Sequence, residues 1–170
     1  MGMNVMYKKY KQESGAVLAI SLIILLLLTL IGVTGTQVTG LEEKMAGNMV
    51  DRNLAFQAAE SALRSGENFL TQASLPEFTA TGTSGLYSIT ATPPDQDDDW
   101  SNFNTVTYSV SLGHVKASPE YVIQRLPNVG GSGDSLEAGK YSESEMYRIT
   151  ARGIGGTSTA VAVVQSSYKR

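Results

Sequence analysis

The side chains in this sequence that are best suited to chemistry are four closely spaced carboxylates. They are Asp95, Asp97, Asp98 and Asp99. Clustered carboxylates are typical calcium ligands, but an EF-hand loop has glycine where Trp100 stands and glutamate where Val106 stands. We therefore interpret the run as an exposed acidic loop and predict no metal site, although the sequence leaves calcium binding in this loop open.

Two other patterns approach catalytic or phosphate-binding motifs without fulfilling them. The stretch 133–140, GDSLEAGK, has one residue too many between its glycines for a phosphate loop, and Tyr141 replaces the required Ser or Thr. His114 is the single histidine, which argues against a two-histidine metal site, and the lack of cysteine excludes thiolate ligands. The sequence shows no catalytic residues, so we predict a protein that is not an enzyme and needs no cofactor.

The element that dominates the sequence is a long apolar run near the N-terminus. No charged residue occurs between Glu13 and Glu42, and twelve of the residues from Val17 to Ile31 are Val, Leu or Ile. A helix needs about 20 residues to cross the hydrocarbon core of a bilayer, whereas the apolar part of a signal peptide has about 7–15. We predict that residues 16–38 form a transmembrane helix.

The charges on either side of this run predict its orientation. Lys8, Lys9 and Lys11 precede the run, and Glu42 and Glu43 are the first charges after it. Positively charged flanks stay in the cytoplasm, so we expect a cytoplasmic N-terminus and a C-terminal domain on the outer side of the membrane. The formal net charge of −3, without a basic stripe, argues against nucleic-acid binding.

A helical pattern continues beyond the membrane segment. Apolar residues at spacings of three and four are Leu41, Met45, Met49, Phe56, Ala59, Leu63 and Leu70. We expect the same helix to run on as an amphipathic segment over residues 39–73. Gly66, Ser74 and Pro76 are interpreted as punctuation at its end.

The remaining residues, 74–170, have the pattern of a small sheet. Alternation is clearest over residues 104–112, and further strands are predicted at residues 86–92, 121–126, 146–153 and 159–168. A glycine-rich turn, GIGGTS, joins the last two strands as a hairpin. Because no helical period separates the strands, we predict an α+β fold with an antiparallel sheet, one face of which packs on the outer half of the helix.

These residues together resemble a known family. The glycine, the apolar run and residues 41–67, LEEKMAGNMVDRNLAFQAAESALRSGE, closely resemble the N-terminal region of type IV pilus minor pilins of the PilX family. The tail 147–168, YRITARGIGGTSTAVAVVQSSY, more loosely resembles the closing hairpin of these proteins. The resemblance implies a pilin-like fold and a structural role in a pilus.

The resemblance also implies a processing step at the start of the apolar run. Prepilin peptidases cut on the cytoplasmic side after a glycine and methylate the new amine. In this chain the cut is expected between Gly15 and Ala16, so residues 1–15 are expected to be a leader peptide. Most major pilins have phenylalanine where Ala16 stands, but in this family the glycine matters more.

A second departure from the major pilins concerns Ile20. Most pilins carry a glutamate at this fifth position after the cut, which is taken to pair with the N-terminal amine of the neighbouring subunit above. A subunit at the fibre tip has no such neighbour, so we hypothesise that Ile20 marks a subunit at or near the tip. The simpler alternative is that isoleucine is a good membrane residue.

Small residues at a spacing of four indicate a helix-packing face. Gly32, Thr36 and Gly40 follow the small-xxx-small pattern that lets membrane helices approach closely. Ordinary tolerance of glycine in a membrane span is the alternative. We group these residues, Ile20 and the charged pair Glu42 and Glu43 as candidate sites of helix packing and assembly.

Three functions stay open at this point. The favoured one is a minor pilin, anchored in the inner membrane and then placed at the pilus tip, that joins other minor pilins in a complex priming assembly. The partners implied by the resemblance are the other minor pilins, the major pilin, a PilY-type tip adhesin, the inner-membrane assembly platform and the prepilin peptidase. The alternatives are a type II secretion pseudopilin and a membrane-anchored periplasmic binding domain. Whether adhesion or assembly is the main role stays open.

Overall fold

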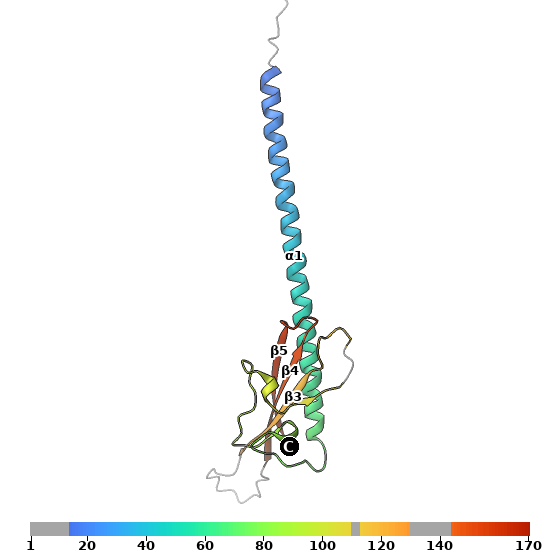
Figure 1. Cartoon of the computed structure of the whole chain (residues 1–170), viewed down its shortest axis with the longest axis vertical. Coiled ribbons are helices and arrows are strands. Elements are labelled where there is room, and N and C mark those ends of the chain that lie inside the picture. Colours follow the sequence, from blue (N-terminus) through green and yellow to red (C-terminus); the bar gives the residue numbers. More distant parts are fainter. Residues whose placement is uncertain (1–13, 110–112, 130–143) are drawn as a thin grey trace, which may run out of the picture. The chain divides into compact units, whose positions relative to one another are not determined.

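The computed structural model describes residues 14–109, 113–129 and 144–170. Helix α1, Ser14–Leu70, begins the described part and has 57 residues (Figure 1). The chain divides into two compact units, one ending at Ala46 and one comprising Gly47–Arg170. The lysines of the N-terminal head, the loop 133–140 and the end of the predicted strand 104–112 lie outside the described residues.

The end of α1 agrees with the sequence, but one part of its predicted signal is wrong. The helix ends at Leu70, and the carbonyls of Gln72 and Ala73 just beyond it accept bonds of 2.8 and 3.1 Å from the Arg170 guanidinium. Gly66 lies inside the helix and not at its end. A Cβ on Gly66 would lie 2.8 Å from Cγ2 of Ile149, so this glycine serves close packing against the sheet.

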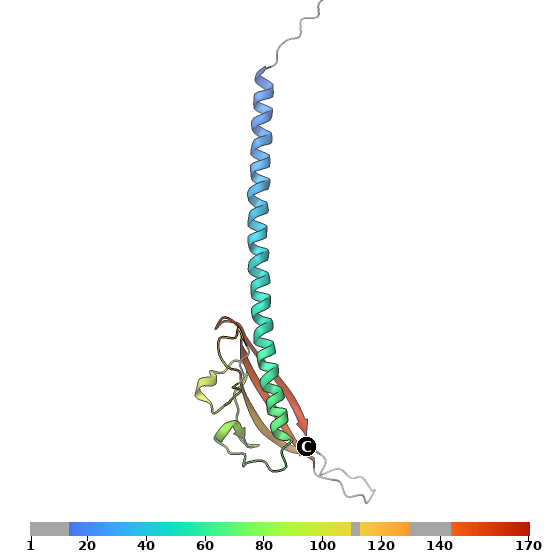
Figure 2. The same ribbon diagram turned by 90° about the vertical axis from the view of Figure 1, so that its right-hand side faces the viewer.

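The second unit contains the end of α1 and a mixed sheet. Its strands are β1 Leu86–Tyr87, β2 Val106–Thr107, β3 Glu120–Val129, β4 Ser144–Ile154 and β5 Val161–Lys169, with short 3₁₀ turns η1 Thr83–Gly85 and η2 Trp100–Asn102. The hydrogen-bonded order is β1-β3-β4-β5, and β2 also pairs with β3. The three long strands form an antiparallel meander, as predicted. Figures 1 and 2 show α1 passing along one face of this sheet.

Three details of the predicted sheet are wrong. The strand predicted at 86–92 is limited to the two residues of β1, Leu86–Tyr87. Strand β1 pairs with β3 in parallel, Leu86 opposite Ile123, so the sheet is mixed and not purely antiparallel. The alternation of residues 104–109 is visible in burial, since Val106 and Tyr108 are half-buried and Thr107 is exposed. However, only the two residues of β2 form a ladder there, because β1 occupies the neighbouring stretch of the same β3 edge.

The core between helix and sheet depends on small helix residues. The buried hydrophobic residues of the helix are Ala55, Ala58, Ala59, Ala62 and Leu70. A Cβ on Gly153 of β4 would collide with the main chain of Ala55 and Ala59, so the helix backbone lies directly on the strand. Phe56, which the sequence assigned to the same apolar stripe, is 45% exposed and is not part of this core. The expected contact between the outer half of the helix and the sheet is therefore confirmed, with alanines as its main components.

The opposite face of the sheet is partly covered by the segment that carries Ala91, Trp100 and Phe103. Its buried cluster comprises Tyr87, Trp100 and Val122. The indole N–H of Trp100 donates to the carbonyl of Asp95 at 2.9 Å, and the guanidinium of Arg152 lies 5.9 Å from the centre of the indole ring. The acidic loop thus folds over an aromatic anchor.

Candidate functional site

The first unit carries the sequence-predicted assembly residues on an exposed apolar helix. One helix in the described residues is long and apolar enough to cross a membrane. In the first unit the large apolar side chains of this helix are half or more exposed, for example Leu25 at 65% and Ile31 at 66%. Such a surface requires lipid or the helices of other subunits around it.

The residues predicted to mark processing and tip placement lie in the first described turns of α1. Gly15 and Ala16 directly follow Ser14, where the helix begins. Ile20 is 56% exposed, so its side chain is available to lipid or to a neighbouring helix. Glu42 and Glu43 are also exposed, at the other end of this unit.

The small-residue face is open along its length. A Cβ added to Gly32 or Gly40 would meet nothing within 4 Å. The hydroxyl of Thr36 donates to the carbonyl of Val33 at 2.8 Å, so its polar group is satisfied within the helix itself. The three residues therefore form a shallow surface that another helix can approach closely.

A carboxylate that was not predicted from the sequence links the helix to the sheet by hydrogen bonds. Asp51 of α1 accepts hydrogen bonds from the amides of Gly156 and Thr157 and from the hydroxyl of Thr157, in the turn between β4 and β5. The hydroxyl bond from Thr157, with smaller contributions from the two amides, lowers the pKa of the Asp51 carboxyl below its usual 3.8. The glycines of the turn predicted the hairpin, but nothing in them indicated an acidic partner about a hundred residues away in sequence.

Several carboxylates of the loop 95–99 accept hydrogen bonds from within the loop and from the adjoining turn η2. The carboxylate of Asp98 accepts from the amide of Asp95 at 2.8 Å, and Asp99 accepts from the amide and hydroxyl of Ser101. The bonds from Ser101 lower the pKa of Asp99. These contacts cap the turn η2 and hold the loop closed. His114 lies in an exposed bend.

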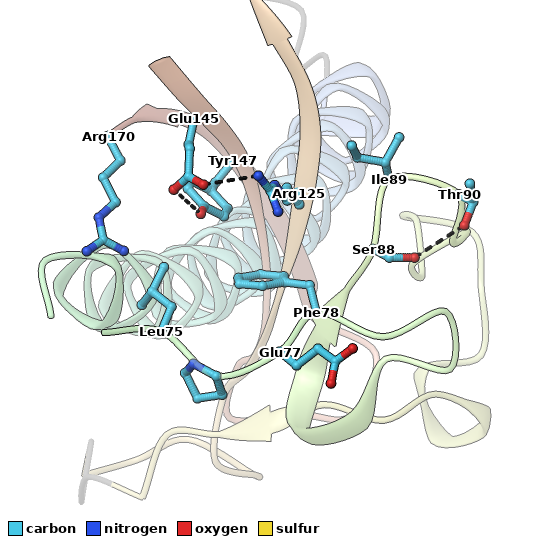
Figure 3. A pocket seen from close by; sticks show the side chains of 11 residues that line it. Leu75, Glu77, Phe78, Ser88, Ile89, Thr90, Arg125, Glu145, Tyr147 and Arg170 are labelled. Carbon is cyan, nitrogen blue, oxygen red and sulfur yellow. Dashed lines mark hydrogen bonds and ion pairs between the residues drawn. The ribbon is translucent and has the colours of Figure 1, made fainter. Parts of the chain in front are cut away.

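A cavity of about 520 Å³ opens beyond the end of α1, between the strands and the segment 75–78. Figure 3 shows Phe78 beside Tyr147 and Arg125, and the two aromatic rings lie 5.3 Å apart. Glu145 accepts from the guanidinium of Arg125 at 3.0 Å and from the hydroxyl of Tyr147 at 2.8 Å. Burial, followed by the bond to Glu145, raises the pKa of Tyr147. In the described residues, the Nε of Arg125 is buried without a hydrogen-bond partner.

This group was not predicted from the sequence. Arg125 and Tyr147 are directly opposite in the β3–β4 ladder, and Glu145 lies two residues before Tyr147 in β4. The strand pattern found both strands but not the register between them, which alone brings the three side chains together. The charges in the cavity balance, and the arrangement contains no nucleophile activated by a neighbouring base.

A long apolar helix followed by a small mixed sheet defines a pilin-like protein. Comparison with protein-family models finds two matches, PilX N-terminal over residues 14–64 and Type IV pilus assembly protein PilX C-term over residues 73–170. The chain belongs to the PilX family of type IV pilus assembly proteins. No curated protein and no solved structure matches it. As a member of this family, the chain is a minor pilin and a structural component of the pilus.

Proposed function

We propose that this minor pilin sits at or near the fibre tip, where it joins other minor pilins in a complex that primes polymerisation of the major pilin. The supporting observation is the exposed Ile20 in place of the glutamate that most pilins carry. A carboxylate deep in a bilayer costs about 2.5–3.5 kcal/mol on insertion scales, so it needs a partner. A tip subunit has no subunit above it to provide that partner.

The proposal includes processing at the start of α1. Prepilin peptidase cuts after Gly15, and Ala16 becomes the methylated N-terminus. The family match over residues 14–64, which begins beside this glycine, supports the boundary. Before assembly the chain is a single-pass inner-membrane protein with a cytoplasmic N-terminus and a periplasmic C-terminal domain. The cut is tested by the intact mass of the chain from cells with and without the peptidase.

The chain has two kinds of surface, the exposed apolar helix and the C-terminal domain, and we assign different partners to each. The exposed apolar helix packs on the helices of other minor pilins and of the major pilin, through the face formed by Gly32, Thr36 and Gly40. The C-terminal domain meets the neighbouring domains and a PilY-type tip adhesin, and the inner-membrane platform drives assembly. Tyr87, Trp100 and Tyr121 are at most 5% exposed, so they are poor candidates for a direct contact with the adhesin.

Tip placement is tested by an Ile20→Glu variant in cells that lack the native chain. We expect the variant to enter the fibre shaft or to assemble poorly, because the new carboxylate seeks a neighbouring amine. Gold-labelled antibody on sheared pili measures the position, and Ile20→Leu is the matched control. Unchanged tip placement and unchanged pilus number in Ile20→Glu would contradict the proposal.

The packing face is tested by two threonine variants on different sides of the helix. Thr36→Leu places a large side chain on the small-residue face, and we expect the number of surface pili to fall severalfold. Thr34→Leu makes the same change on another side of the helix and should leave pilus number near normal. Equal pilus numbers in the two variants would remove the packing role from this face.

A further inference from the structure

Strand β5 leaves one margin of the sheet open. The strand has nine residues, and within the described residues it pairs only with β4. Figure 2 shows β5 at the margin of the sheet opposite the segment that carries η2. Edge strands of this length present a row of main-chain donors and acceptors to any extended segment that reaches them.

The ladder identifies which residues present that row. The amide of Gly155 donates to the carbonyl of Ala160 at 2.8 Å, and the amide of Arg170 donates to the carbonyl of Glu145 at 2.9 Å. In an antiparallel pair, residues that exchange hydrogen bonds alternate with residues that do not. Because the β4–β5 register is unbroken, the even-numbered residues between these two points bond to β4. The outward main-chain groups belong to Val161, Val163, Gln165, Ser167 and Lys169.

The two margins of the sheet differ in how far their edge strands are protected against pairing. On the far side, the edge of β3 is divided between β1 and β2, which have two residues each. Proteins commonly blunt an edge with short strands, prolines or bulges. Strand β5 contains no proline, its pairing with β4 shows no bulge, and its single charge is Lys169 at its end. As far as residues 14–109, 113–129 and 144–170 show, the β5 margin lacks the protection that the other margin has.

The charges beside the open margin have one sign. Arg148 and Lys169 are exposed on the sheet face that points away from α1, and Arg148 lies opposite Ser167 in the ladder. Neither forms an ion pair with another described residue. On this face, neither β4 nor β5 contributes an acidic side chain. An added strand with carboxylates on the same face would complement this pair.

We propose that the outward edge of β5 binds an extended segment of another protein, which adds to the sheet as a further strand and places carboxylates beside Arg148 and Lys169. Main-chain hydrogen bonds to the five outward residues provide the affinity, and the two cations select an acidic segment. A contact of this kind would deepen the proposed function, because it would join two proteins within the tip complex. Strand addition itself depends on the proposed function only for the assembly in which it takes place.

A second copy of the chain is a poorer occupant of the margin. Two β5 strands paired antiparallel would also turn the helical segments Gly47–Leu70 of the two copies in opposite directions, although both chains are anchored in one membrane. Paired in parallel, the strands would bring Lys169 of one copy beside Arg170 of the other. Like charges directly opposite each other destabilise a sheet.

The test measures amide hydrogen exchange by NMR on the full chain in detergent micelles. The probe is a blocked ten-residue peptide in which glutamate alternates with valine and threonine, and its matched control has lysine in place of glutamate. We expect the acidic peptide to slow exchange at Gln165 and Ser167 by about tenfold or more. The amides of Val164 and Ser166, already bonded to β4, should change little, and the lysine peptide should protect less.

Two proline variants check the assignment of the edge. Ser167→Pro removes an outward amide, which edge strands tolerate, so the thermal transition should persist while peptide protection is lost. Ser166→Pro removes an amide bonded to β4 and should destabilise the domain. If Ser167→Pro does not fold, the double variant Arg148→Glu, Lys169→Glu should fold and prefer the lysine peptide.

Three results would overturn the proposal. They are no protection by either peptide, full peptide protection in Ser167→Pro, and protection of the outward amides that rises with protein concentration alone, which would show a second copy as the occupant. This experiment uses no pilus, so its failure would leave the proposed tip role standing. Unchanged tip placement of Ile20→Glu would instead remove the tip role and leave the peptide result intact.

Discussion

The two parts of helix α1 use apolar residues in opposite ways. In the first unit the large side chains are exposed, and Leu18, Leu25 and Ile31 each show about two thirds of their surface. In the second unit the residues buried against the sheet are chiefly alanines, together with Leu70. The helix thus has large apolar side chains where no other part of the described chain packs on it, and small side chains where the sheet packs on it.

This difference separates two kinds of packing. Alanines on the helix and Gly153 on β4 let the backbone of the helix lie directly on the sheet, which fixes the domain. Large exposed side chains stabilise nothing within the chain itself, so they gain free energy only in lipid or against other helices. The second unit is therefore built for its own stability, and the first unit for insertion and assembly.

The largest expected effect distinguishes glycines in the two units. Gly153→Ala introduces a Cβ that collides with the main chain of α1, so we expect it to lower the free energy of unfolding by about 3 kcal/mol or more. Gly35→Ala, where a Cβ meets nothing within 4 Å, should cause no loss. Thermal unfolding of the full chain in detergent, followed by near-UV circular dichroism, compares them. Equal stability of the two variants would contradict the close helix–sheet contact.

The next largest effect on stability distinguishes a leucine in the second unit from one in the first. Leu70 is fully buried, and Leu70→Ala should cost about 2–5 kcal/mol through lost burial and the cavity that remains. Leu27 is 50% exposed, so Leu27→Ala should leave unfolding of the second unit unchanged. Denaturant titration with the same spectroscopic signal measures both. A similar loss in Leu27→Ala would mean that the first unit contributes to the stability of the second.

A smaller effect concerns pH and Asp51. Its pKa in the folded chain lies below the usual 3.8, so the carboxylate contributes stability above about pH 4–5 that is lost as the pH falls through the folded pKa. Asp51→Asn should therefore show a flatter decline of melting temperature between about pH 5 and pH 2. Asp99, whose pKa is also lowered, leaves a residual slope in that variant. Identical pH profiles of variant and native chain would argue against the Asp51 contact.

The smallest effect is expected on the exposed side of α1. Glu60 and Arg64 lie one turn apart with 3.7 Å between their charged atoms, and the Arg64 side chain is 78% exposed. Arg64→Ala should change the free energy of unfolding by at most about 0.5 kcal/mol. A double-mutant cycle with Glu60→Ala isolates the pair, and a coupling above about 1 kcal/mol would contradict its exposure.

The sequence predicted the elements whose signal is local. The apolar run, the end of the helix near Leu70 and the three long strands follow from residue type and period. The alternation at 104–109 also predicted that Val106 and Tyr108 are partly buried, although Thr105 is half-buried as well. It did not predict that only Val106 and Thr107 would form a ladder. That outcome depends on β1, which shares the same edge of β3.

The parts that the sequence did not predict depend on contacts between distant segments. The bond of Asp51 to the turn at Thr157 and the group of Arg125, Glu145 and Tyr147 arise only once helix and strands are in register. Gly66 shows the same limitation, because a glycine near a helix end is a common stop signal and here it serves packing. The parallel pairing of β1 was missed because two residues leave no periodic signal.

The most direct test of the minor-pilin account is the intact mass and N-terminal residue of the chain extracted from membranes, with and without a prepilin peptidase. The account predicts that residues 1–15 are lost only when the peptidase is present, leaving a methylated Ala16 at the start of the exposed helix. Retention of these residues in cells with an active peptidase, or a cut beyond Val33, would contradict it.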